Sequence, residues 1–411
     1  MSGFYPSDRY GYAELLTDAE RAALLRLRAV LDGQVRPLLG DHWERGEFPD
    51  AIVAPLLGLN LMEPAEVAAA GETPGGLYAG FRNFELARAD ASVATWYNAQ
   101  SGLFRTTVGL GGDAAQVAEL EPRIRSFGLK GVFALTEPGH GSDIAGGLET
   151  RARFEPAAAG ARSGSGDRTG AGSAGAGSWV IDGAKRWIGG AAGADVLAVF
   201  ARDEADGLVK CFLVPTDAAG LTITKMRGKT SLRIMQNADI VLDGVRVDAS
   251  ARLANINGWP DVAACLRNMR SDVAWIATGA AAGAYEAAVG YVAAREQFGR
   301  PVGGFQLVQE KLATMLGNVT ASLGMAVRLT QQQDAGVYRD ENSALAKMFT
   351  ARALRETAAL AREVVGGNGI LLENDVARFH ADAEAIYSYE GTHEINALVV
   401  GRAVTGIGAF R

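Results

Sequence analysis

The sequence predicts an α+β protein of three successive regions, in which a β region separates two helical ones. Residues 1–129 and 251–411 carry apolar residues at the three- and four-residue spacing of amphipathic helices. Residues 130–250 instead contain short β-branched and aromatic runs with Asp-Gly pairs between them. We therefore expect an N-terminal all-α domain (1–129), a middle antiparallel, barrel-like β domain (130–250) and a C-terminal four-helix bundle (251–411).

The N-terminal region is expected to begin with a capped helix. Thr17 stands three residues before Glu20, which is the spacing of a capping box, and apolar residues follow at helical spacing as far as Leu31. A second long helical segment is predicted from Leu77 to Gly102.

Seven runs of the middle region have the composition of strands: VFAL, TRARF, WVIDG, VLAVFA, VKCFLVP, LTITKM and IVLDGVRV. Asp182-Gly183, Asp206-Gly207 and Asp243-Gly244 are the predicted turns. Pro156 to Ser178 is almost entirely Ala, Gly, Ser, Arg and Asp. Such a segment buries too little apolar area to offset its ordering entropy, so we expect a mobile loop.

The C-terminal region has an apolar stripe typical of a bundle helix. Its residues recur at three and four positions, from Val308 through Met315 and Val319 to Leu323. Glycine-containing breaks at Gly299, Gly336 and Gly366 divide the region into long helices with short connections, which favours antiparallel packing.

Composition excludes several classes of protein. The net charge of −7 argues against general nucleic-acid binding, which needs a dense basic surface. The four histidines lack zinc-ligand spacing, so we expect no metal site. No signal peptide and no membrane span are expected. Cys211 and Cys265 form no disulfide framework, which favours a reducing compartment and a cytoplasmic location.

Two segments of the middle region carry residues suited to ligand binding. Leu135–Asp143 reads LTEPGHGSD, in which Thr136 and Ser142 offer hydroxyl groups beside a Pro/Gly turn. Lys185–Gly190 reads KRWIGG, and Trp187 could stack on a flat ring. Each segment also has an ordinary explanation, a surface turn for the first and a core tryptophan for the second.

Two segments of the C-terminal region are equally suggestive. Arg295–Gln306 reads REQFGRPVGGFQ, whose two arginines could meet a pyrophosphate or simply favour a helix C-terminus. Tyr389–Asn396 reads YEGTHEIN, with Glu390 in a turn before a helix that Thr392 could cap. Apolar neighbours would raise the pKa of Glu390, whereas a solvated glutamate near a helix N-terminus is the alternative.

Taken together, the order and spacing of these segments resemble the acyl-CoA dehydrogenase family over essentially the whole chain. TEPGHGSD and KRWIGG resemble its flavin and substrate loop and its second flavin strand. REQFGRPVGGFQ and VVGGNGI resemble its FAD-binding helix ends, the latter of which usually reaches a neighbouring subunit's cofactor. YEGTHEI resembles the turn that carries the base. The C-terminal stretch YEGTHEINALVVGRAVTGIGAF is most similar to glutaryl-CoA dehydrogenases, and SLRIMQNADI is similar to plant short-chain acyl-CoA oxidases of the same branch.

The resemblance implies FAD-dependent α,β-dehydrogenation of an acyl-CoA or acyl-carrier thioester to the 2-enoyl thioester. Glu390 would remove the α proton, and the β hydrogen would leave as hydride to the flavin. Further, it implies a homotetramer (a dimer of dimers) that passes electrons to electron-transfer flavoprotein or O2. The implied cofactor contacts are Leu135, Thr136, Ser142, Trp187, Gly189, Arg295, Phe298, Gln306, Gly366, Gly367, Thr392 and Glu394. The implied substrate contacts are Ser142, Arg270, Tyr389 and Gly391.

This chain departs from the resemblance at two places. Ala94 stands where glutaryl-CoA enzymes carry the arginine that binds the substrate's distal carboxylate, so glutaryl-CoA is disfavoured as substrate. Arg88 on the same predicted helix is the obvious substitute, but the six-residue spacing points it elsewhere. Gly189 and Gly190 replace a Thr-Asn pair, which removes a side-chain contact to the flavin.

Alternative functions stay open at this point. One is an acyl-CoA oxidase of the same fold that reduces O2 to H2O2. Another, of a different class, is a catalytically inactive binding or assembly subunit, against which Glu390 and the flavin segments argue. A nitroalkane-oxidase-like activity is disfavoured because those enzymes carry Asp at the base position.

Overall fold

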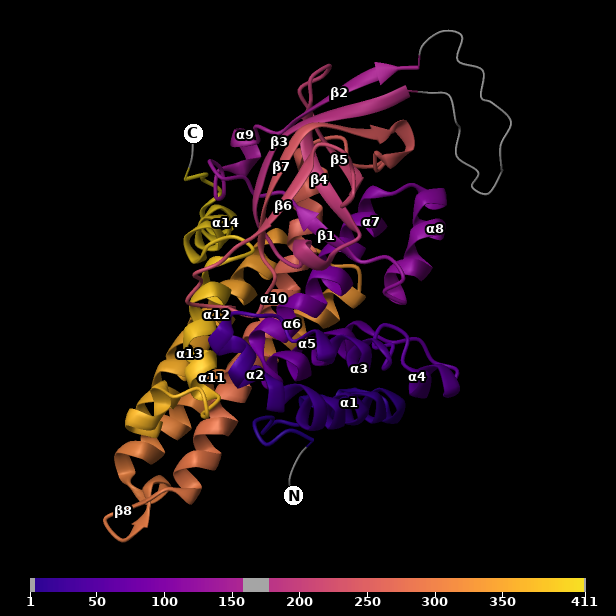
Figure 1. Ribbon diagram of the computed structural model, residues 1–411. Helices are drawn as coiled ribbons and strands as arrows, with labels where there is room; N and C mark the ends of the chain where they lie inside the picture. The colour runs from indigo at the N-terminus through magenta and orange to yellow at the C-terminus, as the bar shows by residue number, and fades with distance from the viewer. Residues whose placement is uncertain (1–3, 158–176, 410–411) are drawn as a thin grey trace. The chain divides into compact units, whose positions relative to one another are not determined.

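The computed structural model describes residues 4–157 and 177–409, and these fall into two compact units. The first unit comprises Met1–Asn98, Arg227–Met235 and Leu266–Arg411, and the second comprises Ala99–Met226 and Gln236–Cys265. Both predicted helical regions therefore contribute to the first unit, while the strands labelled β1 to β7 in Figure 1 belong to the second. Most of the loop expected between Pro156 and Ser178 lies outside the described residues.

The first unit is helical. Its N-terminal helices are α1 (Asp18–Val30), α2 (Arg36–Arg45), α3 (Val53–Leu57), α4 (Ala65–Ala69), α5 (Gly76–Ala89) and α6 (Ala91–Asn98). Its C-terminal helices are most of α10 (Trp259–Ala294), then α11 (Gln306–Asp334), α12 (Asp340–Val365), α13 (Val376–Ser388) and α14 (His393–Thr405). Helix α12 packs against α11, α13 and α14. The predicted capping box is confirmed, because Thr17 and Glu20 each bond the other's backbone N–H.

The helix predicted as one piece from Leu77 to Gly102 is broken at Asp90. The backbone of Asp90 is extended (φ −166°, ψ 134°), and its carboxylate accepts hydrogen bonds from the N–H groups of Ser92 (2.9 Å) and Val93 (3.2 Å). Asp90 thus ends α5 and caps α6. The helical pattern of apolar residues continues across this break, which is why periodicity alone missed it.

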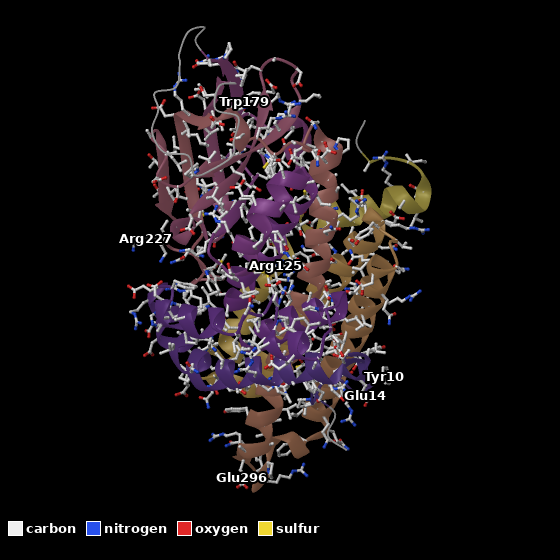
Figure 2. The ribbon with its side chains drawn as sticks, turned by 90° about the vertical axis from the view of Figure 1, so that its right-hand side faces the viewer. Tyr10, Glu14, Arg125, Trp179, Arg227 and Glu296 are labelled. Atoms are coloured by element: carbon white, nitrogen blue, oxygen red, sulfur yellow. The ribbon has the colours of Figure 1, made fainter. Side chains whose placement is uncertain are left out.

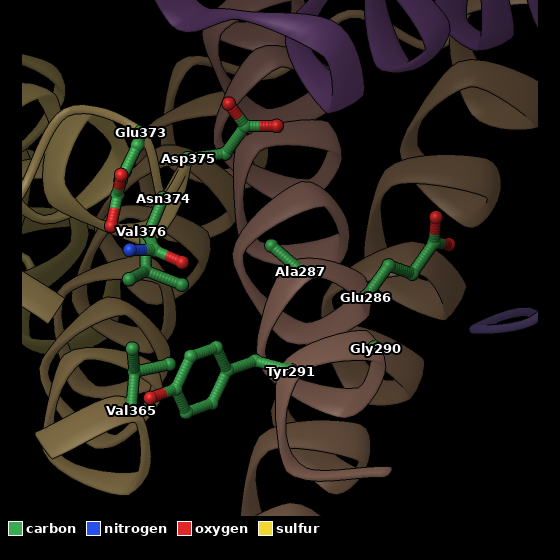
Figure 3. A pocket seen from close by; sticks show the side chains of 9 residues that line it. All are labelled: Glu286, Ala287, Gly290, Tyr291, Val365, Glu373, Asn374, Asp375 and Val376. Carbon is green, nitrogen blue, oxygen red and sulfur yellow. The ribbon is translucent and has the colours of Figure 1, made fainter. Parts of the chain in front are cut away.

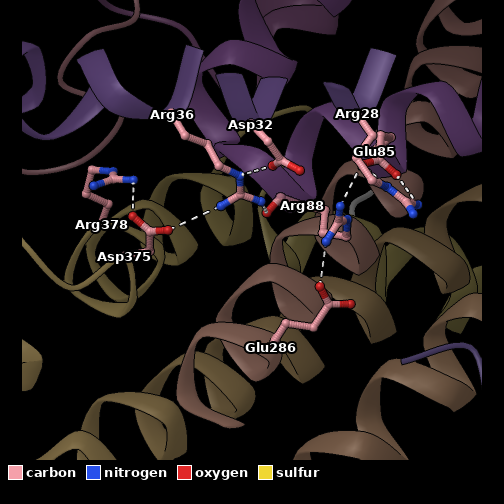
Figure 4. A network of polar contacts seen from close by, with 8 residues as sticks. All are labelled: Arg28, Asp32, Arg36, Glu85, Arg88, Glu286, Asp375 and Arg378. Atoms are coloured by element: carbon pink, nitrogen blue, oxygen red, sulfur yellow. Dashed lines mark hydrogen bonds and ion pairs between the residues drawn. The ribbon is translucent and has the colours of Figure 1, made fainter. Parts of the chain in front are cut away.

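A network of ion pairs joins the N-terminal helices to α10 and α13 (Figure 4). Arg88 is its centre, pairing with Glu85 at 2.8 Å and with Glu286 at 2.6 Å. The other pairs are Arg28–Glu85, Arg36–Asp32, Arg36–Asp375 and Arg378–Asp375. Because Glu85 and Arg88 are buried, each charge depends on its partners, and loss of one partner would leave a costly unpaired ion.

The second unit is built on a seven-stranded sheet with the order β1-β4-β2-β3-β7-β6, in which β5 also pairs with β4. The strands are β1 (Gly131–Ala134), β2 (Arg151–Pro156), β3 (Gly177–Ile188), β4 (Val196–Asp203), β5 (Val209–Pro215), β6 (Leu221–Lys225) and β7 (Ala238–Asp248). Three helices accompany them: α7 (Arg105–Gly111), α8 (Ala114–Arg125) and α9 (Ile144–Gly147). Trp179, labelled in Figure 2, packs on Phe154 and Phe212 in this unit.

The sheet is mixed rather than wholly antiparallel. Strand β4 runs parallel to both β1 and β2, and the other pairings are antiparallel. Only Asp206-Gly207 forms a turn between strands; Asp182-Gly183 and Asp243-Gly244 lie inside β3 and β7. There the ladder shifts register between Ile181 and Gly183, and Asp182 accepts a hydrogen bond from the N–H of Gly244 at 2.6 Å. An Asp-Gly pair therefore marked a bulge where we expected a turn.

Helix α10 approaches α5 closely because it carries small residues. A Cβ on Gly279 would lie 2.2 Å from the carbonyl oxygen of Phe84, and one on Gly283 would lie 2.4 Å from that of Arg88. The same side of α5 contributes Phe81, whose ring lies 4.9 Å from the ring of Trp275. The Ala/Gly-rich stretch of α10 is thus a close-packing surface inside the helical unit.

Helix α11 is long and apolar enough to cross a membrane by length and composition alone, although no span was expected from the sequence. Its most apolar window has a mean hydropathy of 1.2, and 39% of that window is buried inside the structure. Its buried positions include Met315, Val319 and Leu323 of the predicted stripe, and the helix packs on α12. Bundle packing is therefore a sufficient reason for its apolar composition.

We expect Gly279→Ala to lower the thermal unfolding midpoint of the holoenzyme. The new methyl group meets a backbone oxygen, and overpacking of this kind costs about 1–3 kcal/mol, more than the ~1 kcal/mol that alanine contributes in a helix. Gly290→Ala on the same helix is the matched control, because nothing lies within 4 Å of its Cβ position. That control should stabilise by about 0.5–1 kcal/mol. Equal effects of the two substitutions would contradict this account of α10.

Candidate active site

Glu390 lies in a tight turn between α13 and α14. Its backbone is left-handed (φ 53°), as is that of Gly391 (φ 84°). Thr392 then caps α14 by accepting a hydrogen bond from the N–H of Ile395 at 3.2 Å. The buried side chain of Asn396 donates to the carbonyl oxygens of Gly391 (2.8 Å) and Thr392 (2.9 Å), so α14 holds the turn from one side. The predicted cap by Thr392 is confirmed.

Lys347 on α12 holds the same turn from the other side. This side chain is buried, and its ammonium group donates to the carbonyl oxygens of Tyr387 and Gly391, both at 2.9 Å. Burial lowers the pKa of Lys347 to about 8, while the charge on Glu390 works in the opposite direction. Lys347 was not among the sequence-based candidates, although a lysine on an otherwise apolar helix face was a usable signal.

The environment of Glu390 is suited to a carboxylate that gains and loses a proton. Burial raises the pKa of Glu390, and the nearby cations Arg270 and Lys347 partly oppose that rise. Arg270 is near enough to be affected in return, since burial lowers its pKa and Asp340 and Glu390 raise it. A carboxylate raised towards neutrality is matched to general-base catalysis.

Tyr389 and Asp272 complete the surroundings of Glu390. The hydroxyl groups of Tyr389 and Thr95 lie 3.5 Å apart. Burial raises the pKa of Asp272 to about 6, Arg82 lowers it, and the charge on Glu390 raises it further. Sequence reasoning missed Asp272, although an aspartate inside the apolar run that follows Arg270 could have been noticed.

The second unit brings together the predicted cofactor residues at the ends of β1 and β3. Lys185 is buried and donates to Glu137 (2.8 Å) and to the carbonyl oxygen of Leu135 (3.1 Å). The carbonyl oxygen of Thr136 accepts from the N–H of Arg186 at 2.8 Å. Residues 135–137 are thereby held against 185–187, so Leu135 and Thr136 lie beside the strand end that carries Trp187.

Trp187 is presented outward at this edge. Its side chain is 55% exposed, and its backbone is left-handed (φ 64°), a conformation that few non-glycine residues adopt. The guanidinium of Arg186 lies 5.1 Å from the centre of the indole ring. Gly189 follows half-buried, and Ser142 lies exposed in the loop before α9. The alternative of a core tryptophan is therefore wrong.

Five further predicted cofactor residues lie at the far end of the bundle. Arg295, Phe298 and Gln306 surround the hairpin of β8 (Glu296–Gln297) and β9 (Arg300–Pro301), whose Glu296 is labelled at the tip in Figure 2. Gly366 and Gly367 begin the turn after α12, and Asn368 in that turn donates to the hydroxyl of Tyr291 at 2.7 Å. Lys347 and Val365 are roughly 27 Å apart along α12, at ~1.5 Å per residue. These five residues thus lie far from Glu390 within one chain.

A cavity of about 290 Å³ lies between α10 and the segment 365–376 (Figure 3). Its lining includes Glu286, Tyr291, Glu373 and Asp375. None of the residues predicted for catalysis lines it, and its acidic walls do not suit a phosphate-bearing ligand. The chemistry points to the turn of Glu390 instead. Among the described residues, no group of three or more His, Cys, Asp or Glu side chains is arranged to hold a metal ion.

Comparison with known proteins identifies the family. Residues 132–245 match the middle domain of acyl-CoA dehydrogenases, and residues 257–405 match their C-terminal domain. The chain is 30% identical to a 3-(aryl)acrylate reductase of Clostridium sporogenes, over 91% of this chain and 95% of the relative. It is also 30% identical to the mouse mitochondrial short-chain specific acyl-CoA dehydrogenase, over 86% of this chain and 82% of the relative. The chain belongs to the acyl-CoA dehydrogenase family.

Similarity to solved structures supports the same family. The structure of a Mycobacterium smegmatis glutaryl-CoA dehydrogenase in complex with FADH2 has a TM-score of 0.86 and 31% identity, over 99% of this chain and all of that one. As a member of the acyl-CoA dehydrogenase family this chain is an FAD-dependent oxidoreductase.

The residues assigned to FAD by resemblance fit a large, flat, anionic group. The side chains of Trp187 and Phe298 are 55% and 93% exposed, which leaves aromatic surface to cover a ring system. Arg295 is an exposed cation, and nothing lies within 4 Å of a Cβ built on Gly366 or Gly367, so backbone can approach a ligand there. Glu394 is exposed at the start of α14, and Thr392 is already engaged as its cap.

Arg88 does not replace the arginine that is absent at Ala94. Ala94 is completely buried on α6, and Arg88 on α5 donates to Glu85 and Glu286 instead. The expectation that Arg88 points elsewhere is confirmed, and Figure 4 shows it in the ion-pair network.

We expect Lys347→Met to move the acid limb of the pH–rate profile of flavin reduction to higher pH. The positive charge of Lys347 lowers the pKa of Glu390. Removing that charge therefore raises the pKa and keeps Glu390 protonated, and so inactive as a base, to a higher pH. Lys311→Met is the control, because Lys311 on α11 pairs with Glu363 at 3.4 Å. A limb that stays in place in Lys347→Met would contradict the electrostatic role.

Proposed function

We propose that this enzyme dehydrogenates an acyl-CoA, or an acyl-carrier thioester, between its α and β carbons, with Glu390 as the base. The observation that carries the proposal is the half-buried carboxylate of Glu390, whose pKa is raised by desolvation, in a turn fixed by Lys347 and Asn396. Family membership supplies the FAD, which when bound accepts the β hydrogen as hydride.

The residues around Glu390 explain how the α proton can be removed. A thioester α proton is weakly acidic, so its removal needs a base held at a fixed place and freed from water. The turn supplies the fixed place, and burial supplies the raised proton affinity. Arg270 and Lys347 favour the ionised carboxylate, which is the form that can act as a base, because their charges oppose the effect of burial.

We expect Glu390→Gln to keep FAD bound but to lose flavin reduction by acyl-CoA, by at least about 10²-fold, since an amide cannot accept the α proton. Glu384→Gln is the matched control: Glu384 lies on α13 with an exposed side chain and pairs with Arg355 at 2.9 Å. The measurement is anaerobic bleaching of the flavin absorbance after mixing with butyryl-CoA. Near-normal bleaching in Glu390→Gln would remove Glu390 as the base.

An uncharged short or branched acyl chain should be preferred to glutaryl-CoA. A charge-assisted hydrogen bond contributes ~1.5–3 kcal/mol, and Ala94 provides none, so the loss in specificity should be at least ten- to a hundredfold. The assay compares flavin bleaching by butyryl-CoA, isobutyryl-CoA and glutaryl-CoA and follows carbon dioxide release from the last. Turnover of glutaryl-CoA as fast as that of butyryl-CoA would sink this expectation.

We also propose a homotetramer, with a cytoplasmic location. In one chain, Gly366 and Gly367 follow the end of α12, roughly 27 Å along that helix from Lys347, which holds the base-bearing turn, and the β8–β9 hairpin joins α10 to α11. In an assembly, the glycine turn and the hairpin of one chain would contact the cofactor of a neighbouring chain. The exposed ring of Phe298 and the open space around Gly366 and Gly367 support such an interface. Light scattering of the holoenzyme counts the chains.

The electron acceptor is a separate question. Electron-transfer flavoprotein and O2 are the candidates. Gly189 and Gly190 leave the flavin without a side-chain contact, and this difference bears on how the reduced flavin reacts with O2. Stopped-flow reoxidation of the reduced enzyme in air separates the two: reoxidation within the turnover time indicates an oxidase.

A further inference from the structure

A second carboxylate, that of Asp272, lies beside the base on α10. Asp272 follows Arg270 by two residues and is only half-buried, as Glu390 is. The next twelve residues of α10, 273–284, are all buried. Asp272 is thus the last residue before this buried stretch of α10 to keep accessible surface.

Helix α6 contacts both Asp272 and the turn that carries Glu390. Thr95 on α6 lies with its hydroxyl 3.5 Å from that of Tyr389, the residue next to the base. Asn98 lies three residues further on the same face of α6, and its side chain is hydrogen-bonded to Asp272. The contact between Thr95 and Tyr389 and the hydrogen bond between Asn98 and Asp272 thus start from residues about one helical turn apart on α6. The charge on Glu390 is accordingly felt at Asp272.

The protein already compensates the charge of Asp272. Arg82 on α5 is buried, and its charge lowers the pKa of Asp272. Arg82 donates to the side chain of Asn83 (3.3 Å) and lies 5.3 Å from the centre of the Tyr97 ring. Asn83 in turn donates to Asn98 at 3.4 Å, so one buried polar cluster holds both Arg82 and Asp272. A ligand group at Asp272 therefore need not be a cation.

The half-buried carboxylate of Asp272 is a hydrogen-bond acceptor for a ligand placed beside it. A carboxylate offers about four lone-pair sites, and Asn98 occupies only part of that capacity. A methyl or methylene group laid over the rest would desolvate it without a hydrogen bond, which is unfavourable. A hydroxyl group in the same place donates to it. Sites built to bond a hydroxyl reject the analogue that lacks it far more strongly than apolar pockets distinguish one methylene.

We propose that Asp272 accepts a hydrogen bond from a hydroxyl group on the acyl chain, beyond its β carbon, so that the site selects a short hydroxyacyl thioester. Asp272 is then a specificity-determining residue. The inference rests on the proposed function, because it takes the acyl chain to lie beside Glu390.

The test uses substrates that differ only in a hydroxyl against a methyl group. Flavin reduction by 4-hydroxybutyryl-CoA is compared with that by pentanoyl-CoA, and 5-hydroxypentanoyl-CoA with hexanoyl-CoA. The wild type should favour one hydroxylated member at least about tenfold in kcat/KM. Asp272→Ala should abolish that preference, and Asp272→Asn should keep part of it, because the amide oxygen still accepts. Asp206→Asn, at the exposed turn between β4 and β5 where Asp206 pairs with Lys210 at 3.0 Å, should leave it unchanged.

A binding measurement separates this proposal from the function on which it rests. Glu390→Gln holoenzyme binds without turnover, and its affinity for each pair follows from the shift of the flavin absorbance. If no thioester bleaches the wild-type flavin, the proposed dehydrogenation is wrong, whereas tighter binding of the hydroxylated member, lost in the Asp272→Ala double variant, still supports Asp272. Equal affinity and equal turnover for both members of each pair, or a preference that survives Asp272→Ala, would overturn the proposal.

Discussion

A buried lysine determines the geometry of the catalytic turn. The ammonium group of Lys347 has few hydrogen-bond acceptors available in the interior, and it takes the carbonyl oxygens of Tyr387 and Gly391 on either side of Glu390. An unpaired buried ammonium is costly, so these two bonds are strongly favoured and the turn between them closes tightly. Glu390 is consequently held with a positive φ, a conformation that costs ~1–3 kcal/mol for a non-glycine residue and persists only where its surroundings require it.

The charge of Lys347 also affects the pKa of Glu390. Burial alone makes Glu390 a stronger proton acceptor but also disfavours its ionised form, and only the ionised form can act as a base. Arg270 and Lys347 counter the second effect without removing the first. One side chain therefore both positions the base and adjusts its charge, which is why α12, α13 and α14 must pack together before Glu390 can work.

The order of the regions and the base-bearing turn followed from the sequence, because periodicity, caps and a tight motif are local features. The break at Asp90 did not, because its cause is an aspartate whose carboxylate accepts from the N–H groups of Ser92 and Val93 while the apolar spacing runs on. Asp182-Gly183 was misread for a similar reason: a bulge inside β3 and a turn between strands ask for the same residues. The roles of Lys347 and Asp272 were not predicted, because these residues approach Glu390 only through the packing of segments that are far apart in the sequence.

Two arginines on α5 show why residue type alone could not describe the acyl site. Arg88, the nearest cation by sequence to Ala94, donates to Glu85 and Glu286 and so serves the packing of α5 on α10. Arg82, six residues earlier, lies with Asn83, Asn98 and Asp272 and lowers the pKa of that aspartate. One arginine of α5 thus stabilises the packing of the helices, and the other interacts with a carboxylate near the base. The polarity near the base therefore depends on which partner each arginine meets in the fold, and Arg82 meets Asp272, the carboxylate that we propose as the hydrogen-bond acceptor for the acyl chain.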